Sequence, residues 1–388
     1  MTDPLAFVHD EIRALSDASL LRTIRPLDSA QEPEVELDGR RVILLASNNY
    51  LGLAADLRIV EAAAEAARRW GAGAGSARLI SGGVRLHDEL ETRLAAFKGT
   101  VSAVLFSSGY LANLGTISAL VGRGDAIFSD ELNHASIIDG ARLSGAEVHI
   151  FRHADPAHLE ELLETNRAGR RLVVTDAVFS MDGDLAPLPS LVDICERHNA
   201  ILMVDEAHAT GVVGPGGRGA IAAAGLEGRV PVVMGTLSKA LGAAGGFIAG
   251  SAALISFLRN RARAFIFDTA PPPPVAAAAL AALDVIAAEP WRADRARALA
   301  RRLADGLARA GFRATDPAAA IVPVHVGEAE ASLALSRALL AQNVLVPAIR
   351  PPSVPPGTAR LRATVMATHT DDHIDAAIRA FAASRVGV

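Results

Sequence analysis

Lysine is scarce in this chain of 388 residues. Of its 38 basic residues only two, Lys98 and Lys239, are lysines, and the rest are arginines. A reaction that needs a lysine amine therefore has two candidate residues. The phosphate loop of nucleotide-binding proteins, G-x-x-x-x-G-K-[ST], is excluded, because Phe97 and Ser238 rather than glycine precede the two lysines.

Cysteine and net positive charge are lacking as well. The single cysteine, Cys195, excludes an internal disulfide and fits a reducing compartment, and we expect it to be a buried free thiol. A net charge of −5 argues against a general nucleic-acid-binding protein. The chain is 51% hydrophobic and 21% charged, a balance typical of a folded globular protein rather than a disordered one.

No apolar run is long enough to cross a membrane. The most apolar stretch, Val275 to Ala288, is rich in alanine, contains Asp284, and is shorter than the roughly 20 residues that a bilayer requires. Residues 1–21 mix charged and apolar positions as an amphipathic helix does, and a secretory signal does not. We therefore expect a soluble protein in the cytoplasm with no membrane partner.

The middle of the chain alternates short β-branched runs with helical patterns. The predicted strands are 102–106, 126–129, 147–151, 171–175, 201–205, 230–234 and 246–250. The predicted helices between them are 110–122, 135–143, 156–165 and 189–199. Nearly continuous apolar strands separated by helices indicate a mostly parallel central sheet with helices on both faces, an α/β fold. Ligands of such sheets lie at the carboxyl ends of the strands.

The pattern changes after the four prolines Pro271–Pro274. Helices are predicted over 275–288, 291–310, 329–341 and 371–384, with strands near 320–326 and 359–365. This mixture indicates a smaller α+β domain. The predicted division is an N-terminal helix and strand segment over 1–45, a large α/β domain over 46–274, and a small C-terminal domain over 275–388.

Two motifs mislead when they are taken alone. Asp205-Glu206-Ala207-His208 spells the DEAH box of helicases, but that class of protein also needs the phosphate loop excluded above. Gly214 to Gly219 matches G-x-G-x-x-G, yet it contains a proline and lacks a strand and helix around it, so we predict a surface turn. The eleven histidines lack the spacing of zinc sites, and no metal is predicted.

Lys239 follows an apolar strand and precedes several glycines. A lysine there is either a solvated surface residue or a Schiff-base former whose pKa is lowered by burial, and context alone leaves both open. Asp205 ends the most apolar strand of the chain. A buried carboxylate needs a hydrogen-bonding or cationic partner, such as a helix N-terminus that it caps or the pyridinium nitrogen of pyridoxal phosphate (PLP).

Other strand ends carry groups that suit an anion and an aromatic ring. Gly109 and Tyr110 begin a helix directly after a strand, where free N–H groups and the helix dipole favour a phosphate. Thr236, three residues before Lys239, offers a hydroxyl to the same phosphate. His134 also follows a strand end and can stack on a ring.

The order of these segments resembles the α-oxoamine synthase family of fold-type I PLP-dependent enzymes over nearly the whole chain. The segments are Ser47–Gly52, Ser107–Tyr110 with Asn113, Asn133–Ser136, Val178–Asp184, Val204–His208, Thr236–Lys239, Arg350–Pro355 and Gly357–Arg362. The resemblance implies a fold-type I PLP-dependent transferase, and a homodimer with its active site between two subunits.

The resemblance also implies roles for single residues. Lys239 would form the Schiff base with PLP and act as general base, and Asp205 would pair with the pyridine nitrogen. The remaining cofactor contacts would come from His208 at the phenolic oxygen, Ser180 at the same ring edge, His134 on the ring face, and Gly109, Tyr110 and Thr236 at the ring and phosphate. Arg362, rather than Arg360, would bind the amino-acid carboxylate. The substrate pocket would be bordered by Arg22, Asn48, His134 and Ser353.

Within the family, the resemblance favours the decarboxylative condensation of a pimeloyl thioester with L-alanine, a step of biotin synthesis. It rests on Arg78–Gly82, Phe265–Ala270 and Arg350–Pro355. The acyl carrier, coenzyme A or a carrier protein, stays open. The alternatives are glycine C-acetyltransferase or another reaction of this family and, more remotely, a regulator with the same fold but no activity. Lys98, at the end of a predicted helix just before Gly99, is expected to have a structural role.

Overall fold

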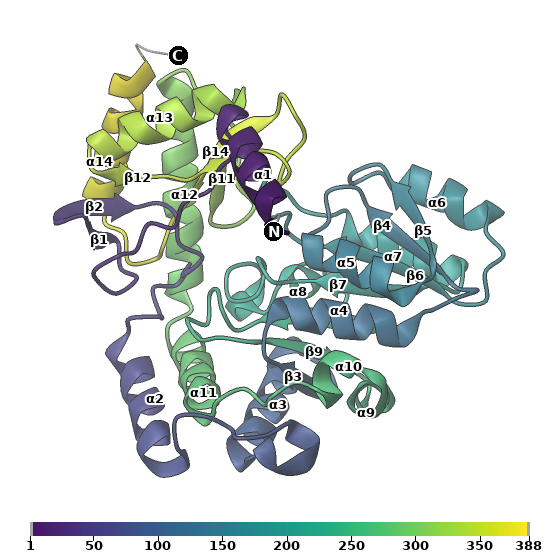
Figure 1. Ribbon diagram of the computed structural model, residues 1–388. Coiled ribbons are helices and arrows are strands. Elements are labelled where there is room, and N and C mark those ends of the chain that lie inside the picture. The colour runs from purple at the N-terminus through teal and green to yellow at the C-terminus, as the bar shows by residue number, and fades with distance from the viewer. Residues whose placement is uncertain (1–2, 386–388) are drawn as a thin grey trace.

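A seven-stranded sheet forms the centre of the larger part of the molecule in the computed structural model, which describes residues 3–385 (Figure 1). In their order across the sheet, the strands are β3 (Ser102–Phe106), β9 (Gly246–Gly250), β8 (Val232–Thr236), β7 (Ile201–Asp205), β6 (Arg171–Asp176), β4 (Ala126–Asp130) and β5 (Glu147–Phe151). Strands β8, β7, β6, β4 and β5 run parallel to one another, and β9 runs antiparallel to both of its neighbours, β3 and β8. The prediction of a mostly parallel sheet is confirmed.

Helices cover both faces of this sheet because its strands are apolar on both sides. Leu105 and Phe128 belong to one buried cluster, whereas Val104 and Ile127, the preceding residues of the same strands, belong to another. The helices of this part are α2 (Leu57–Trp70), α3 (Arg85–Lys98), α4 (Gly109–Leu120), α5 (Ala135–Ser144), α6 (Pro156–Thr165), α7 (Leu188–Arg197), α8 (Ala220–Ala223), α9 (Ala252–Arg261) and α10 (Arg263–Ile266). Figure 1 shows α4 and α5 on one side of the sheet.

The C-terminal part contains a smaller, antiparallel sheet. Its strands, in spatial order, are β10 (Arg313–Ala314), β11 (Ile321–Gly327), β14 (Ala359–Thr364) and β13 (Ala348–Ile349). The helices are α11 (Pro273–Ala288), α12 (Trp291–Arg309), α13 (Ala329–Ala341) and α14 (Asp371–Ser384). The predicted α+β character is therefore present here.

The N-terminal segment lies against this C-terminal part (Figure 1). Helix α1 (Ala6–Asp17) is followed by a hairpin of β1 (Glu34–Leu37) and β2 (Arg40–Leu44). Strand β2 pairs in parallel with β12 (Val344–Leu345), about three hundred positions later in the chain. The domain boundaries at 45 and 274 stay a prediction.

Within residues 3–385, no single helix is both long and apolar enough to cross a membrane. Helices α11 and α12 reach the required length and composition only together, and they are bent by 81° relative to each other.

Lys98 is structural, as expected, but it acts through a buried ion pair instead of an exposed helix end. Its Nζ lies 2.8 Å from Glu206 Oε2 and also donates to Thr210 Oγ1, at 2.7 Å. Gly99 ends the helix at φ +67°, in the left-handed region. Glu206 of the DEAH sequence is thus the partner of the structural lysine.

Two smaller predictions are also confirmed. The Gly214–Gly219 sequence forms a turn, which packs against the Glu206 carboxylate: a side chain at Gly219 would lie 2.3 Å from Glu206 Oε2. Cys195 is buried and free, and burial raises the pKa of its thiol to about 12. Its thiol is therefore protonated and unreactive at neutral pH.

Candidate active site

Polar side chains meet where the parallel strands end. Asp176 at the end of β6 is in register with Asp205 at the end of β7, and Asp205 is in register with Met234 of the next strand. Lys239 lies in the turn that follows β8. Parallel strands end at one edge of a sheet, so these groups gather there.

Lys239 is a strong candidate for amine chemistry. Burial lowers the pKa of its ammonium to about 8, although the carboxylates of Asp205 and Asp176 oppose that shift. Roughly a tenth of the amine is therefore free of its proton at pH 7, far more than at the ordinary pKa of 10.5, and a nucleophilic lysine needs this free form.

Asp205 is a buried carboxylate with hydrogen-bonding partners but no cation bound to it. Its Oδ2 accepts from Asn113 Nδ2 at 2.7 Å, and its Oδ1 accepts from the N–H of Ala207 at 2.8 Å. No lysine or arginine forms an ion pair with it in the described part of the chain. A buried carboxylate in this state is suited to a cationic ring nitrogen.

His134 is joined to Asp205 by a chain of hydrogen bonds. Asn113 Nδ2 also donates to Ser136 Oγ at 2.8 Å, and that hydroxyl lies 2.8 Å from His134 Nδ1. The N–H of Ser136 donates to the same Nδ1 at 3.2 Å, so the neutral ring carries its proton on Nε2. Burial lowers the pKa of His134, which favours this neutral form with a free Nε2–H donor.

Tyr50 connects three of the predicted site residues. Its hydroxyl lies 2.7 Å from His208 Nδ1, donates to Asn48 Oδ1 at 3.1 Å, and accepts from Arg362 Nη2 at 3.2 Å. Arg362 also donates to Asn48 Oδ1 and to the carbonyl oxygen of Ser180. The guanidinium is thus held by neutral acceptors and keeps its full charge for a ligand.

Arg360, the second candidate for the carboxylate, is already engaged in an ion pair. Its guanidinium contacts the carboxylate of Asp182. Successive side chains of a strand point to opposite faces, so Arg360 and Arg362, two residues apart in β14, point to the same face of the sheet. They differ in their hydrogen-bonding partners. Arg362 is the arginine that reaches Asn48 and Tyr50.

The residues predicted to hold the ring and phosphate lie around the start of α4. Gly109 begins that helix, and a side chain there would lie 2.9 Å from Met234 Cε. Tyr110 is exposed, and its hydroxyl donates to Asp139. Thr236 is buried, and its hydroxyl donates to the carbonyl of Gly245 at 2.9 Å, so it also shapes the turn that carries Lys239.

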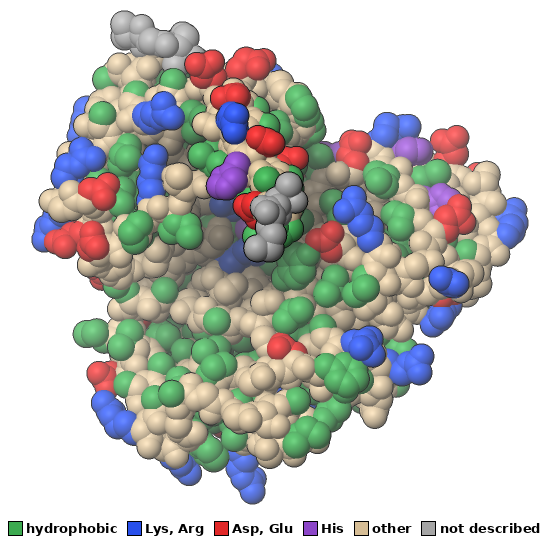
Figure 2. Space-filling view, viewed as in Figure 1, with side chains coloured by type: hydrophobic (Ala, Val, Ile, Leu, Met, Phe, Trp, Pro, Cys, Tyr) green, Lys and Arg blue, Asp and Glu red, His purple; other side chains and the backbone are tan. Residues whose placement is uncertain are grey.

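Ser353 belongs to the C-terminal part, and Arg22 contacts that part. Arg22 Nη2 donates to the carbonyl of Pro351 at 3.3 Å. Ser353 belongs to the proline loop, defined here as residues 351–356, which lines a pocket of about 680 Å³ together with Leu132, Ile138, Phe179 and Met181. Figure 2 shows this face of the molecule hollowed between the C-terminal lobe and the lobe of the large sheet.

Four residues of the site were not predicted individually. Tyr50, Asn113 and Ser136 stood inside segments of the family resemblance, whereas Asp176 gave no separate signal beyond its position after a strand. Asp176 accepts from the N–H of His134 at 3.1 Å. Burial, together with the charge of Asp205, raises the pKa of Asp176 well above its usual value.

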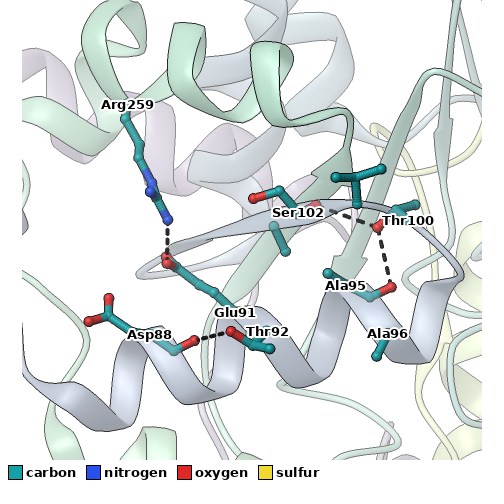
Figure 3. Close-up of a pocket in the computed structure, with 10 residues that line it drawn as sticks. Asp88, Glu91, Thr92, Ala95, Ala96, Thr100, Ser102 and Arg259 are labelled. Atoms are coloured by element: carbon teal, nitrogen blue, oxygen red, sulfur yellow. Dashed lines mark hydrogen bonds and ion pairs between the residues drawn. The ribbon is translucent and has the colours of Figure 1, made fainter.

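A second pocket, of about 440 Å³, lies between α3, β3 and α9 (Figure 3). Arg259 points across it to Glu91, and their side chains are 2.6 Å apart. Glu91 is buried and also binds Arg78 and the N–H of Leu105. None of the predicted site residues is among its described lining, and its charged groups join the surrounding elements to one another.

The site suits PLP and offers no metal centre. Within residues 3–385, no group of three or more histidine, cysteine or carboxylate side chains is placed to hold a metal ion. The buried Asp205 needs a cation, Lys239 supplies an amine of lowered pKa, and the buried Asn113 Oδ1 has no partner. An aldehyde on a protonated pyridine ring fits this combination of groups.

Comparison with known proteins identifies the family. A family model described as aminotransferase class I and II matches residues 40–381. The 8-amino-7-oxononanoate synthase of Anaeromyxobacter dehalogenans is 52% identical over 379 residues, covering 98% of this chain and 95% of that protein. The chain belongs to the α-oxoamine synthase family.

Solved structures of this family have the same fold. A serine palmitoyltransferase variant from S. paucimobilis with bound PLP and myriocin superposes with a TM-score of 0.93 at 35% identity, covering 99% of this chain and 98% of that one. The 8-amino-7-oxononanoate synthase of Francisella tularensis gives a TM-score of 0.77 at 27% identity, covering 88% and 97%. The fold-type I assignment and PLP as the cofactor are thereby confirmed.

Proposed function

We propose that this α-oxoamine synthase is an 8-amino-7-oxononanoate synthase, which condenses a pimeloyl thioester with L-alanine and releases carbon dioxide and the free thiol of the acyl carrier. The observation that carries the proposal is the meeting of Lys239, Asp205, His134 and Arg362 in one site of a chain that is about half identical, over nearly its whole length, to relatives of that name. The reaction belongs to biotin synthesis, and we place it in the cytoplasm.

Lys239 is proposed as the residue that holds the cofactor and moves the proton of alanine. Bound PLP supplies an electron sink for the charge that develops on the amino-acid carbon. Asp205 would keep the ring nitrogen protonated, and His208, with Ser180 beside it, would hold the phenolic oxygen. With its pKa lowered to about 8, the Lys239 amine accepts the Cα proton at neutral pH and returns a proton to the product.

Arg362 and His134 are proposed to position the two substrates. The Arg362 guanidinium binds the alanine carboxylate, with Asn48 and Tyr50 fixing its plane. His134 would stack on the ring, and its Nε2–H, left free because Nδ1 accepts from Ser136, would donate to the thioester oxygen as negative charge develops there. Gly109, Tyr110 and Thr236 are proposed to hold the cofactor ring and phosphate.

The pocket beside the proline loop supports a long acyl group. Its volume of about 680 Å³ and its apolar walls, which include Leu132, Ile138, Phe179 and Met181, suit a seven-carbon chain. An acetyl group would leave most of that apolar surface in contact with water. This observation favours the pimeloyl donor over the acetyl donor of a glycine C-acetyltransferase.

A homodimer is proposed as the working form. Large apolar side chains lie exposed around α10 and the segment before α3, among them Phe267, Leu79 and Ile80. Apolar surface of this kind is typical of subunit interfaces. Sedimentation of the purified protein tests this part: a dimer is expected, and a monomer with full activity would contradict it.

The function is tested by a crossed assay. Alanine and glycine are each offered with pimeloyl-CoA and acetyl-CoA, and carbon dioxide release is measured. The highest kcat/KM is expected for alanine with pimeloyl-CoA, and Lys239→Ala is expected to abolish turnover and the visible absorbance of the lysine-bound cofactor. A preference for glycine with acetyl-CoA would replace the proposed reaction by that of a glycine C-acetyltransferase.

A further inference from the structure

Asn113 and Ser136 are buried polar residues that connect Asp205 with His134. Their side chains are no more than 1% exposed. Asn113 lies on α4 and Ser136 lies on α5, two helices that pack against each other beside the large sheet. Burying a polar side chain costs free energy unless it is hydrogen-bonded, so the partners of these two residues define what they do.

The direction of each hydrogen bond follows from the chemistry of the groups. Asn113 lies 2.7 Å from Asp205 Oδ2, and a carboxylate only accepts, so Asn113 presents its amide nitrogen there. The same Nδ2 donates to Ser136 Oγ at 2.8 Å, which leaves the hydroxyl proton for His134 Nδ1, also at 2.8 Å. The charge of Asp205 thus orients the amide, the amide orients the hydroxyl, and the hydroxyl points its proton at the ring.

His134 Nδ1 receives two hydrogen bonds. Besides the hydroxyl, the backbone N–H of Ser136 donates to it at 3.2 Å, because His134 is the N-cap residue of α5. A proton on Nδ1 would face both of these donors, so the ring keeps its single proton on Nε2. The N-terminus of α5 also carries partial positive charge, which disfavours an imidazolium at this position.

Charged groups around His134 act in both directions. Burial has the largest effect and lowers the pKa of His134, Lys239 lowers it further, and Asp205 and Asp139 raise it, with a net decrease. The carboxyl of Asp176 accepts from the backbone N–H of His134 at 3.1 Å and not from the ring. The geometry and the surrounding charges therefore both favour a neutral imidazole.

We propose that Asn113 and Ser136 are positioning residues, which hold the His134 ring neutral with its proton on Nε2. The inference rests on the proposed function, in which this Nε2–H donates to the thioester oxygen. A neutral imidazole at a helix N-terminus stabilises charge on a carbonyl oxygen by donating a hydrogen bond that it does not have to give up. In this state His134 acts as a fixed donor and transfers no proton.

Nitrogen NMR of the holoenzyme tests the tautomer directly. With isotope-labelled histidine, the shifts of the two ring nitrogens distinguish a proton on Nε2 from one on Nδ1 and from the imidazolium. Signals that are missing from His134→Asn identify this residue among the eleven histidines. In the parent we expect the Nε2–H form at neutral pH; either of the other two forms would overturn the inference.

Ser136→Ala and Asn113→Leu remove the two links separately. Ser136→Ala takes away the hydroxyl and keeps the backbone N–H, whereas Asn113→Leu keeps a side chain of similar size and frees the Ser136 hydroxyl to rotate away. In both variants we expect a measurable population of the Nδ1–H form. For Ser136→Ala we expect kcat to fall by about threefold to thirtyfold, with KM for alanine unchanged because Arg362 keeps its contacts.

Ser144→Ala is the matched control. Ser144 lies at the other end of α5, and its hydroxyl donates to the carbonyl oxygen of Ala141 at 2.7 Å, outside the chain of hydrogen bonds between Asp205 and His134. Its replacement is expected to leave the His134 signals and the kinetic constants as in the parent. A general effect of losing a hydroxyl from α5 would instead change both serine variants alike and contradict the inference.

Unchanged His134 signals in both Ser136→Ala and Asn113→Leu would also overturn the inference, and they would leave the synthase activity in place. Absence of condensation by the parent protein with alanine and any pimeloyl donor would instead overturn the proposed function. Circular dichroism and the visible absorbance of the bound cofactor show whether each variant is folded and loaded. The tautomer of the parent needs no variant of Asn113 or Ser136 to fold.

Discussion

The hydroxyl of Tyr50 lies 2.7 Å from Nδ1 of His208, and the two residues are 158 positions apart in the chain. The same hydroxyl accepts from Arg362. One phenol therefore joins a residue proposed to contact the cofactor to a residue proposed to contact the substrate. Burial raises the pKa of Tyr50, so the phenol keeps its proton and its neutral hydrogen bonds at physiological pH.

Tyr50→Phe keeps the buried ring and removes these contacts. We expect kcat/KM for alanine to fall by about tenfold to hundredfold, because Arg362 and His208 each lose a buried hydrogen bond. Steady-state kinetics with each substrate varied in turn checks this. The effect is expected in the KM for alanine and not in that for the acyl donor; equal losses for both would show that Tyr50 does not act through Arg362.

The lowered pKa of Lys239 predicts the pH dependence of cofactor uptake. Only the deprotonated amine reacts with the aldehyde of PLP, so the uptake rate of PLP-free protein is expected to rise as the pH passes through about 8. The visible absorbance after adding PLP, followed over a pH series around that value, measures it. A midpoint near 10.5, the ordinary lysine value, would contradict the role of burial.

The buried pair of Lys98 and Glu206 predicts a large stability effect. Lys98→Met leaves the Glu206 carboxylate buried without its cation, and we expect a loss of about 3 to 5 kcal/mol in the free energy of unfolding. The double variant Lys98→Met with Glu206→Gln removes the unpaired charge and is expected to recover part of that loss. Thermal or urea unfolding measures both; a double variant less stable than Lys98→Met would contradict this account.

The raised pKa of His153 predicts how the free energy of unfolding changes between neutral and alkaline pH. This histidine lies between Asp130 and Asp184, at 3.0 and 2.8 Å, and although burial alone would lower its pKa, these contacts raise it to about 10. Because the folded pKa exceeds the ordinary value of 6.5, the stabilisation is complete below pH 6.5 and is lost as the pH rises through about 10.

His153→Gln is expected to remove that dependence. The parent should be more stable than the variant at neutral pH, and the difference should shrink progressively toward pH 10. Unfolding curves across this range give the comparison. His9→Gln, a change at an exposed histidine of α1, is the control and is expected to leave the profile as in the parent. A difference that grows with pH would have the wrong sign for this mechanism.

The hydrophobic pattern predicted most strands and helices of the large sheet. Predicted strands 102–106, 147–151, 201–205 and 246–250 have the observed bounds. Strand β8 begins at Val232 and not at 230, because Pro231 has no N–H to donate to a neighbouring strand. A continuous apolar run marks those strands that are buried on both faces, such as β7 and β8.

The sequence predicted those candidate site residues that follow directly on an apolar strand. Asp205 and Lys239 are recognisable from their apolar approach and their glycine-rich surroundings. The role of Asn113 was not recognisable in this way, because its hydrogen bonds to Asp205 and Ser136 depend on how α4 and α5 pack on the sheet. The contacts of Tyr50 were not predictable for the same reason, because its partners His208 and Arg362 come from two other segments of the chain.

The sequence by itself determined the alternation of strands and helices, the scarcity of lysine that left Lys239 as the Schiff-base candidate, and the order of motifs typical of the family. Only the tertiary structure decided which distant groups meet. It pairs Lys98 with Glu206 and Arg360 with Asp182, and it brings Arg362 within hydrogen-bond distance of Tyr50. The guanidinium of Arg350 contacts the carbonyl oxygen of Ser19 and no carboxylate. Local patterns record which face a residue buries, but the partner of a buried charge depends on the packing of elements far apart in the chain.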